Sequence, residues 1–357
     1  MVCEALAEAV VQLDPTAQID RLPFSDGGEG AFELFDALNL GKAVLCETQD
    51  PLGRNISANY YAFKDGKTAW IELSQASGIA LLKEEEKNAL QTSTFGTGLQ
   101  IKHALESGYR NLILGIGGSA TNDLGTGIFS ALGGKLKDSS GKILEAKGAS
   151  LALCTQLDYS DVMPSVKDTT ITVACDVSNT LLGPAGAAHT YAPQKGALPQ
   201  DVITLEHGAT HFAELLYKLS GKAISKIKGG GAAGGTAAGM LGLFNSTLEP
   251  GFDLLSQLTK LEERVKSADL ILTGEGKTDN QSQYGKVPFK VAELAKKYKT
   301  PVVLFAGSVT ANPAILNQAG ITESFSIKSD AMTLDYAKAN AYRLLKEKAL
   351  QQLKKYL

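Results

Sequence analysis

One segment of the chain, residues 115–125, combines closely spaced glycines with hydroxyl, amide and carboxylate side chains. The apolar run 111–114 before it is typical of a buried parallel strand, and the run 127–132 after it is typical of the start of a helix. A glycine-rich turn at such a junction lets backbone N–H groups approach an anion closely, and the helix N-terminus adds partial positive charge. We therefore predict a phosphate site, and its candidate contacts are Gly117, Gly118, Ser119, Thr121, Asn122 and Asp123.

The turn does not match the common nucleotide-binding fingerprints. Gly115, Gly117 and Ala120 fit the loose pattern G-x-G-x-x-G/A, but the acidic residue that should close the second strand is missing. The pattern G-x-x-x-x-G-K-[ST] is absent as well, because Ile271 stands where its first glycine would be. Since tight turns need glycine for positive φ angles in any case, a turn without a ligand stays the alternative.

Four other polar, glycine-rich segments follow predicted strands or begin predicted helices. Ligands of open α/β sheets bind at the carboxyl ends of the strands, so these segments and the first one together indicate a composite site. Asp26 and Glu29 of the earliest segment are candidate substrate contacts. The four segments are residues 26–30, 175–179, 229–235 and 273–279.

Charged side chains in or near these segments suit particular ligands. Carboxylates at strand ends favour Mg²⁺, which binds a few carboxylates together with phosphate oxygens and water. Asp176 and Asp279 are candidate metal ligands, and together with Glu275 they are candidate catalytic groups that hold the metal or accept a hydroxyl proton. Asp279 equally fits a simple turn cap, because Asp is common in turns. Lys195 is a candidate phosphate contact or a solvated lysine, and the planar guanidinium of Arg54 suits a substrate carboxylate.

Length and composition narrow the class of protein. A chain of 357 residues predicts about two domains. Its 35 basic and 38 acidic side chains leave a net charge of −3, so the chain lacks the excess of basic residues that is typical of nucleic-acid-binding proteins. No apolar stretch is long enough to span a bilayer, so no membrane partner is expected. The four scattered cysteines lack metal or redox spacing, which favours reduced thiols and a cytoplasmic location.

Hydrophobic periodicity predicts an α/β chain. The N-terminal part reads as helices at 2–12 and 31–38, a strand at 18–24, and antiparallel strands at 42–48, 55–63 and 68–73. The middle reads as a helix at 98–107, a strand at 170–174, a helix at 199–220 and a close-packed helix from about residue 231. In the last third, strands at 269–273, 301–306 and 323–327 alternate with helices at 287–297, 311–319 and 334–356. Such alternation indicates parallel strands covered by helices.

Taken together, these motifs resemble those of the bacterial glycerate kinase family, in its type-1, glyoxylate-pathway form. They occur in the order of the family and extend over nearly the whole chain, so the resemblance is far more specific than any single motif. The motifs that carry it are DGGEG (26–30), DPLGR (50–54), TSTFGTG (92–98), GIGGSATND (115–123), ACDVSNTLLGPAGA (174–187), APQKGA (192–197), GAAGG (231–235), TGEGKTDNQS (273–282) and AGS (306–308).

The resemblance implies ATP-dependent phosphorylation of D-glycerate, with 2-phosphoglycerate favoured over 3-phosphoglycerate as the product. ATP and Mg²⁺ are then the expected cofactors, and glycerate and ATP the expected small-molecule partners. It also implies a discontinuous flavodoxin-like domain with a parallel sheet, formed by residues 1–80 and 286–357, whose N- and C-terminal parts share one sheet. A mixed α/β domain of residues 81–285 is expected to be inserted within it.

The chain also departs from the family pattern. That pattern places a strand and a D-S-F-K-G segment before the helix that starts here at Met1, and this sequence lacks both. Lys277 stands where the family usually has arginine, and Leu124 where glycine is common. Two alternatives therefore stay open. One is a kinase or phosphatase of another small hydroxy acid, and the other is an inactive homologue that only binds nucleotide or metabolite.

Overall fold

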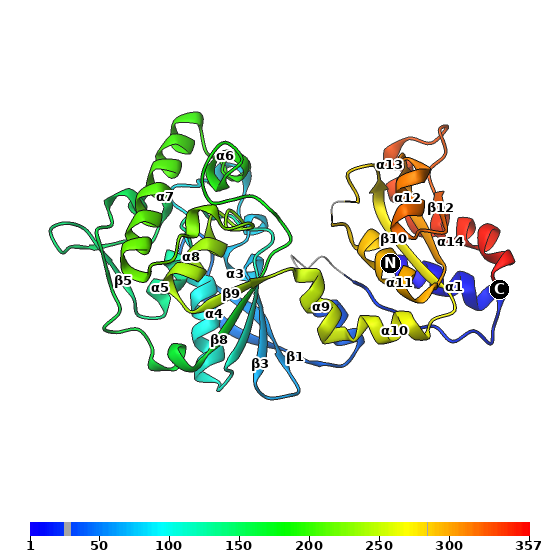
Figure 1. Ribbon diagram of the computed structural model, residues 1–357, viewed down its shortest axis with the longest axis horizontal. Helices are drawn as coiled ribbons and strands as arrows, with labels where there is room; N and C mark the ends of the chain where they lie inside the picture. The colour runs from blue at the N-terminus through cyan, green and yellow to red at the C-terminus, as the bar shows by residue number, and fades with distance from the viewer. Residues whose placement is uncertain (25–29, 284) are drawn as a thin grey trace. The chain divides into compact units, whose positions relative to one another are not determined.

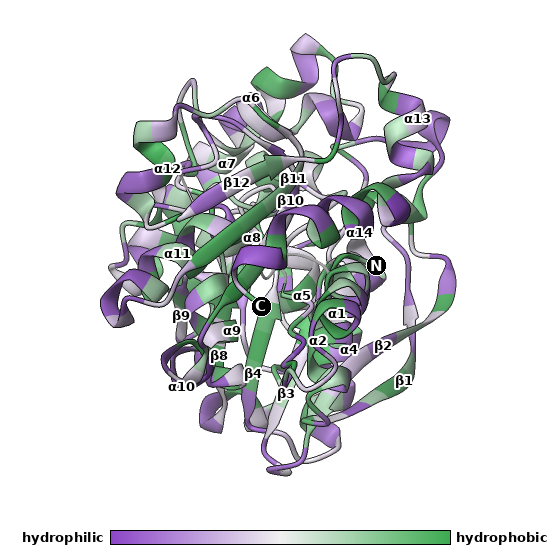
Figure 2. Ribbon diagram, turned by 90° about the vertical axis from the view of Figure 1, so that its right-hand side faces the viewer, coloured by the Kyte–Doolittle hydropathy of each residue, from purple (hydrophilic) through white to green (hydrophobic). Residues whose placement is uncertain are grey.

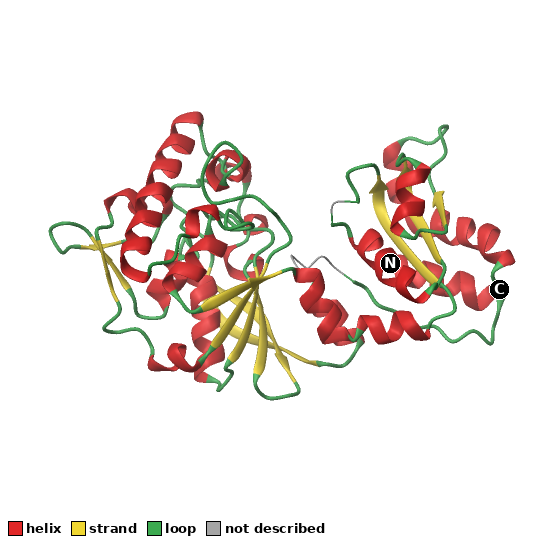
Figure 3. Cartoon of the chain, viewed as in Figure 1, coloured by secondary structure: helices red, strands yellow, loops and turns green. Residues whose placement is uncertain are grey.

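The computed structural model describes residues 1–24, 30–283 and 285–357, and it consists of two α/β units (Figure 1). One unit is discontinuous and comprises residues 1–26 and 255–357, while residues 27–254 form the unit inserted between them. Each unit has its own sheet with helices packed on it, as Figure 3 shows. The predicted class, two α/β domains, is confirmed.

The inserted unit is built on a six-stranded sheet with the order β1-β2-β3-β4-β8-β9. The pairs β1–β2 and β2–β3 are antiparallel, and β3, β4, β8 and β9 run parallel. A second, antiparallel sheet has the order β6-β5-β7. The strands are β1 (Gly41–Gln49), β2 (Asn55–Phe63), β3 (Thr68–Glu72), β4 (Asn111–Gly115), β5 (Lys135–Lys137), β6 (Ile143–Leu144), β7 (Gln156–Asp158), β8 (Thr170–Ala174) and β9 (Ser246–Glu249).

Alternation along these strands directs side chains to two apolar layers. Leu112 and Leu114 of β4 face the main core, where helices α4 and α5 also place buried side chains, and Figure 2 colours most of β4 as hydrophobic. On the antiparallel strands, Phe35 of α2 packs against the rings of Tyr61 and Trp70. The helices of this unit are α2 (Ala31–Ala37), α3 (Ser74–Ser77), α4 (Phe95–Glu106), α5 (Thr126–Ala131), α6 (Ala187–Tyr191), α7 (Pro199–Ser220) and α8 (Thr236–Leu243).

The discontinuous unit has a parallel sheet with the order β10-β11-β12. Helices α1 and α14 pack together, and their apolar side chains share a core with Val303 and Phe305 of β11. Helix α11 contacts β10 and β11. The elements are α1 (Val2–Leu13), α9 (Gly251–Thr259), α10 (Leu261–Ser267), β10 (Ile271–Thr278), α11 (Val287–Tyr298), β11 (Val302–Val309), α12 (Pro313–Ala319), β12 (Glu323–Ser326), α13 (Leu334–Ala339) and α14 (Ala341–Gln352).

The unit boundaries differ from those expected at residues 80 and 285. Strand β3 pairs with β4 along its whole length, so β1–β3 belong to the sheet of the inserted unit and do not join β10–β12. The boundaries therefore lie near residue 26 and at 254/255, within helix α9. The organisation itself, one unit inserted into a discontinuous one, is the arrangement that the resemblance implied.

Three predicted elements differ in detail. Residues 18–24 form no strand, and no described strand pairs with them. The final helix is divided into α13 and α14 at Asn340, whose side-chain amide donates to the carbonyl of Tyr336. Residues 229–235 form glycine-rich turns, and helix α8 begins only at Thr236. In the part of the chain that the structure describes, no helix combines the length and the apolar character needed to cross a membrane.

Candidate functional site

The predicted phosphate loop, residues 116–125, leaves the carboxyl end of β4, between the ends of β3 and β8. Its backbone is fixed on one side by the segment that follows β3. The N–H of Ile79 donates to the carbonyl of Gly118 over 2.8 Å, and the N–H of Ala120 donates to the carbonyl of Ser77 over 2.9 Å. Gly118 has a φ of 65°, which favours glycine. The loop is thus held at the edge of the sheet where α/β proteins bind ligands.

Lys195 meets this loop from the short 3₁₀ helix Pro193–Lys195. Its ammonium group donates to the hydroxyl of Ser119 over 2.8 Å and to the carbonyl of Thr121 over 2.7 Å. Lys195 is only 2% exposed, so the alternative of a solvated surface lysine is wrong. Burial lowers the pKa of Lys195 to about 7, and the negative charge of Asp123 opposes this shift.

Two further donors of the loop are buried and have no hydrogen-bond partner in the described structure. They are the hydroxyl of Thr121 and the side-chain amide nitrogen of Asn122. Leaving a buried polar group unpaired costs about 1–3 kcal/mol, so such groups in a native site point to a missing partner. Together with Lys195 and Ser119 they form a set of donors that suits an anionic oxygen. We call Ser119, Thr121, Asn122 and Lys195 the donor cluster.

Asp123 is directed into the protein. It is fully buried, and its Oδ2 accepts hydrogen bonds from the N–H and the hydroxyl of Thr94, both over 2.8 Å. The N–H groups of Gly125 and Gly127 donate to the same carboxylate over 3.2 Å. Burial raises the pKa of Asp123, whereas these four hydrogen bonds favour its anion. The N-terminus of α5, which the sequence suggested would face a phosphate, is therefore capped by Asp123 instead.

The glycine-rich turns of residues 229–235 support the loop from another side. The N–H of Leu124 donates to the carbonyl of Gly234 over 3.3 Å. A Cβ atom at Gly234 would lie 2.0 Å from the carbonyl oxygen of Thr121, and one at Gly239 would lie 1.7 Å from that of Leu124. Leu124 has a φ of 51°, a conformation that favours glycine, and its buried side chain offsets that strain. These glycines therefore serve close backbone packing against the loop.

Arg54, the candidate for a substrate carboxylate, already has two acidic partners. Its Nε pairs with Asp50, and its Nη1 lies 2.7 Å from Oε1 of Glu86. The Arg54 side chain is 49% exposed, whereas Asp50 is buried and accepts two further hydrogen bonds from the backbone of the same turn. A substrate carboxylate would have to replace Glu86, because Asp50 is committed to the turn.

The carboxylates proposed for the metal lie at strand ends in two different units. Asp176 follows β8 in the inserted unit and is exposed. Glu275 and Asp279 belong to the other unit, on and just after β10. Within the described residues, no three His, Cys, Asp or Glu side chains gather in a way that would hold a metal ion. Asp26 and Glu29 lie outside the described residues.

Nearby residues already provide hydrogen-bond or ion-pair partners for carboxylate oxygens of Glu275 and Asp279. The hydroxyl of Thr278 donates to Glu275 over 2.8 Å. One oxygen of Asp279 accepts from the N–H of Gln281 over 2.9 Å, and the other lies 2.9 Å from the ammonium of Lys277. The hydrogen bond with Lys277 and that from the Gln281 backbone lower the pKa of Asp279. Asp279 is thus a carboxylate that closes a turn, and its Lys277 contact is exposed and exchangeable.

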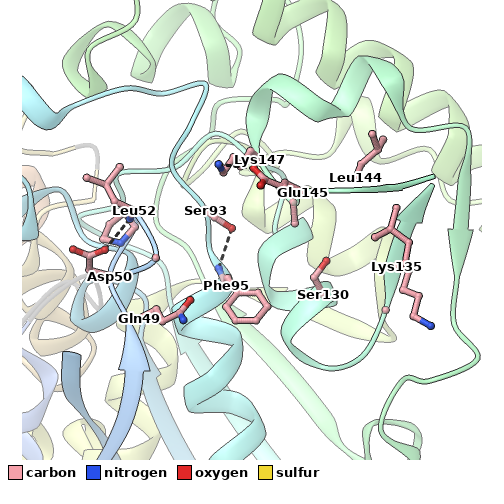
Figure 4. A pocket seen from close by; sticks show the side chains of 15 residues that line it. Gln49, Asp50, Leu52, Ser93, Phe95, Ser130, Lys135, Leu144, Glu145 and Lys147 are labelled. Atoms are coloured by element: carbon pink, nitrogen blue, oxygen red, sulfur yellow. Dashed lines mark hydrogen bonds and ion pairs between the residues drawn. The ribbon is translucent and has the colours of Figure 1, made fainter. Parts of the chain in front are cut away.

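An open pocket of about 420 Å³ lies in the inserted unit, and Figure 4 shows the side chains that line it. It is lined by the turn after β1, by Ser93 and Phe95 at the start of α4, and by residues around β5 and β6. Apolar Leu52, Phe95 and Leu144 face it together with the amide of Gln49. None of the predicted site residues that the structure describes lines this pocket.

The sequence reasoning missed the residues that hold the loop. Thr94 anchors Asp123 and also accepts the N–H of Ile128 over 3.1 Å. Thr92 donates its hydroxyl to the carbonyl of Ala120 over 2.9 Å. The run of hydroxyl residues at 92–94 before a predicted helix was the available signal, because such residues commonly cap helices or bind nearby backbone groups.

Comparison with known proteins gives a consistent picture. The model of the glycerate kinase family matches residues 1–356. The chain is 40% identical to the glycerate 2-kinase of Escherichia coli K12, over 96% of this chain and 90% of that protein. It is 40% identical to a glycerate kinase of Halalkalibacterium halodurans, over 97% and 91% of the two chains. A crystal structure from Salmonella typhimurium LT2, of a protein assigned as glycerate kinase 2, superposes with a TM-score of 0.85 at 36% identity and covers 98% of this chain and 92% of that one.

Proposed function

Because this chain belongs to the glycerate kinase family, we propose that it transfers the terminal phosphoryl group of ATP to a hydroxyl group of D-glycerate. The similarity to a protein named glycerate 2-kinase favours 2-phosphoglycerate as the product. Glycerate and ATP are then the small-molecule partners, and the cytoplasmic location stays a prediction.

The observation that carries the proposal is the donor cluster. Phosphoryl transfer requires little covalent chemistry from the protein, and depends on positioning and on neutralising charge at the phosphate oxygens. Among the described residues, the hydroxyl of Thr121 and the amide nitrogen of Asn122 are buried donors without partners, and the ammonium of Lys195 lies 2.8 Å from the hydroxyl of Ser119 and 2.7 Å from the carbonyl oxygen of Thr121. We assign these groups and Ser119 to the phosphates of ATP.

The remaining roles follow from the chemistry of each side chain. Asp176 and Asp279 are our candidates to hold Mg²⁺, which when bound would neutralise charge on the phosphates. Glu275 is the further candidate to accept the proton of the attacking hydroxyl. Arg54 is the candidate for the glycerate carboxylate, with Glu86 as the partner that it would give up. Asp26 and Glu29 remain predicted substrate contacts.

A coupled assay for ADP release tests the activity directly. We expect ATP consumption that requires both Mg²⁺ and D-glycerate. Stimulation by another small hydroxy acid but not by D-glycerate would favour the alternative substrate. An absence of turnover with the whole panel of hydroxy acids would favour a homologue that only binds nucleotide or metabolite.

The variant Thr121→Val tests the donor cluster. It removes a hydroxyl that makes no hydrogen bond in the described structure, so stability should be unchanged or slightly higher. A lost bond to a charged phosphate is worth about 1.5–3 kcal/mol, so the KM for ATP should rise roughly 10- to 100-fold. The matched control is Thr92→Val. It removes a buried hydroxyl that donates hydrogen bonds to the carbonyls of Asn88 and Ala120, so it should lower stability instead. An unchanged KM in Thr121→Val would remove this cluster from the ATP site.

A further inference from the structure

We propose that Asp123 is a positioning residue: its buried carboxylate fixes the loop of residues 116–125 and supplies the negative field that keeps the ammonium of Lys195 charged. This inference rests on the proposed function insofar as Lys195 serves ATP. It assigns to Asp123 no contact with ATP, metal or glycerate, although its residue type and place in the glycine loop suggested one.

The geometry separates Asp123 from the donor cluster. The carboxylate of Asp123 accepts both hydrogen bonds that Thr94 donates. It also accepts hydrogen bonds from the N–H groups of Gly125 and Gly127. The N–H of Ile128 donates in turn to the hydroxyl of Thr94 over 3.1 Å. One carboxylate therefore joins the starts of α4 and α5, and the loop that carries Ser119, Thr121 and Asn122 ends at this joint.

The ammonium of Lys195 contacts the carbonyl of Thr121, two residues before Asp123, and the negative charge of the Asp123 carboxylate favours the charged form of the lysine. The hydrogen-bond partners of the ammonium are a hydroxyl of Ser119 and a carbonyl of Thr121, which are neutral. Lys87 lies near, because its carbonyl would be 2.3 Å from a Cβ at Gly196, but its ammonium pairs with Glu84. Burial favours the neutral amine of Lys195, and the field of Asp123 favours the ammonium.

This arrangement has a definite consequence for pH. Lys195 is about half protonated near pH 7 in the folded state, against an ordinary pKa of 10.5. Loss of the Asp123 charge should lower the pKa of Lys195 further, by about one unit or more. If Lys195 must be cationic to receive a phosphate, kcat/KM for ATP falls as pH rises through this pKa. The alkaline limb of kcat/KM should then lie near pH 7 in the wild type and at lower pH without Asp123.

The test compares Asp123→Asn with Thr94→Val. Asp123→Asn removes the charge and keeps the shape, whereas Thr94→Val removes one hydrogen bond to the carboxylate and keeps the charge. We expect the alkaline limb of kcat/KM to move about one pH unit or more in Asp123→Asn, and to stay in place in Thr94→Val. If Asp123 were merely structural, both variants would have a lower melting temperature and the alkaline limb of kcat/KM would stay in place in both. That result would overturn the proposal.

A second measurement needs no kinase activity. Because the unfolded chain binds more protons than the folded one above the lowered pKa of Lys195, stability should rise with pH from about pH 7 toward pH 10.5 in the wild type. In Asp123→Asn this rise should begin below pH 7, and it should vanish in Asp123→Asn/Lys195→Met. Unfolding can be followed by fluorescence of Trp70, the one tryptophan of the chain, which is buried in the inserted unit.

These measurements distinguish the two proposals. If no substrate supports turnover but the stability curve shifts as described, the proposed function fails and the role of Asp123 stands. If Asp123→Asn does not fold, the test uses Thr94→Val alone, in a chain that keeps Asp123. A KM for ATP raised at least about fivefold, with kcat retained, supports a positioning role for the Asp123 joint, and an unchanged KM overturns it.

Discussion

Substitution of Gly234 by alanine would test whether the glycine-rich turns of residues 229–235 set the geometry of the donor cluster. Gly234 has a φ of 63°, and an added Cβ would lie 2.0 Å from the carbonyl oxygen of Thr121 and 2.5 Å from the Cα of Asn122. Both neighbours are backbone atoms of the loop, so the overlap cannot be relieved by rotating a side chain. The loop must move away from the turn, and the donors of Thr121 and Asn122 must move with it.

The magnitude follows from two separable costs. The left-handed conformation costs an alanine about 1–2 kcal/mol, and overpacking a buried site typically costs about 1–3 kcal/mol. Gly66→Ala is the matched control, since Gly66 has a φ of 67° in the same unit but nothing within 4 Å of its added Cβ. The difference between the two variants isolates the overlap. It should be about 1–3 kcal/mol, or about 2–12 °C in melting temperature for a unit of this size.

The assay combines urea unfolding, followed by Trp70 fluorescence, with steady-state kinetics. Trp70 reports on the inserted unit alone, which avoids a two-state treatment of a two-unit chain. We expect kcat/KM for ATP to fall on the order of 10- to 100-fold in Gly234→Ala, because misplacement of binding groups by about an ångström has effects of that size. Gly66→Ala should keep the wild-type value. Equal stability losses in the two variants, with normal kinetics in both, would refute the packing argument.

Three further predictions concern other parts of the chain. If Asp279 holds Mg²⁺, Asp279→Asn should raise the activation free energy of turnover by several kcal/mol and lower the free energy of unfolding by only about 1 kcal/mol. Normal turnover with a lowered melting temperature would show that Asp279 is a turn residue only. Phe35→Ala should cost about 3–5 kcal/mol in urea unfolding and shift the Trp70 emission to the red, because it opens a ring cluster around Trp70. Burial raises the pKa of Cys154 to about 11, so iodoacetamide at pH 8 should alkylate Cys154 only after denaturation, as peptide mass spectrometry can show.

The sequence predicted the fold well where the hydrophobic period and the length of an element indicated the same type of secondary structure. The alternation of strands and helices after residue 269 corresponds to β10, β11 and β12 with their helices, because each element is long enough to show its own period. Residues 18–24 have a strand-like composition, but a strand exists only within a sheet, and none of the described strands is paired with these residues. The boundary at residue 80 was misplaced for the same reason. Nothing local in β3 indicates that it pairs with β4, about 40 residues further along.

The sequence predicted where the loop of residues 115–125 lies in the fold, and the roles of its residues stay predictions. The loop 115–125 does lie at the carboxyl end of β4, and Lys195 reaches it from 74 residues away in sequence. Residue type alone could not reveal that Lys195 is buried or that Arg54 already has acidic partners. The burial of Lys195 and the pairing of Arg54 with Glu86 depend on contacts between segments far apart in the chain, whereas Asp50 lies in the same turn as Arg54.

The division within the glycine loop can nevertheless be argued from elementary chemistry. A phosphate site is made of donors, and an ionised carboxylate is only an acceptor, so a carboxylate among phosphate contacts must bind a metal or be satisfied by the protein. The second condition holds for Asp123, whose oxygens accept four hydrogen bonds from N–H and O–H groups. With the acceptor facing inward, Thr121 and Asn122 keep donors that no protein group in the described part of the chain accepts. The same loop thus provides its own anchor through Asp123, and the donors of Thr121 and Asn122 stay available for the phosphate contact that we propose.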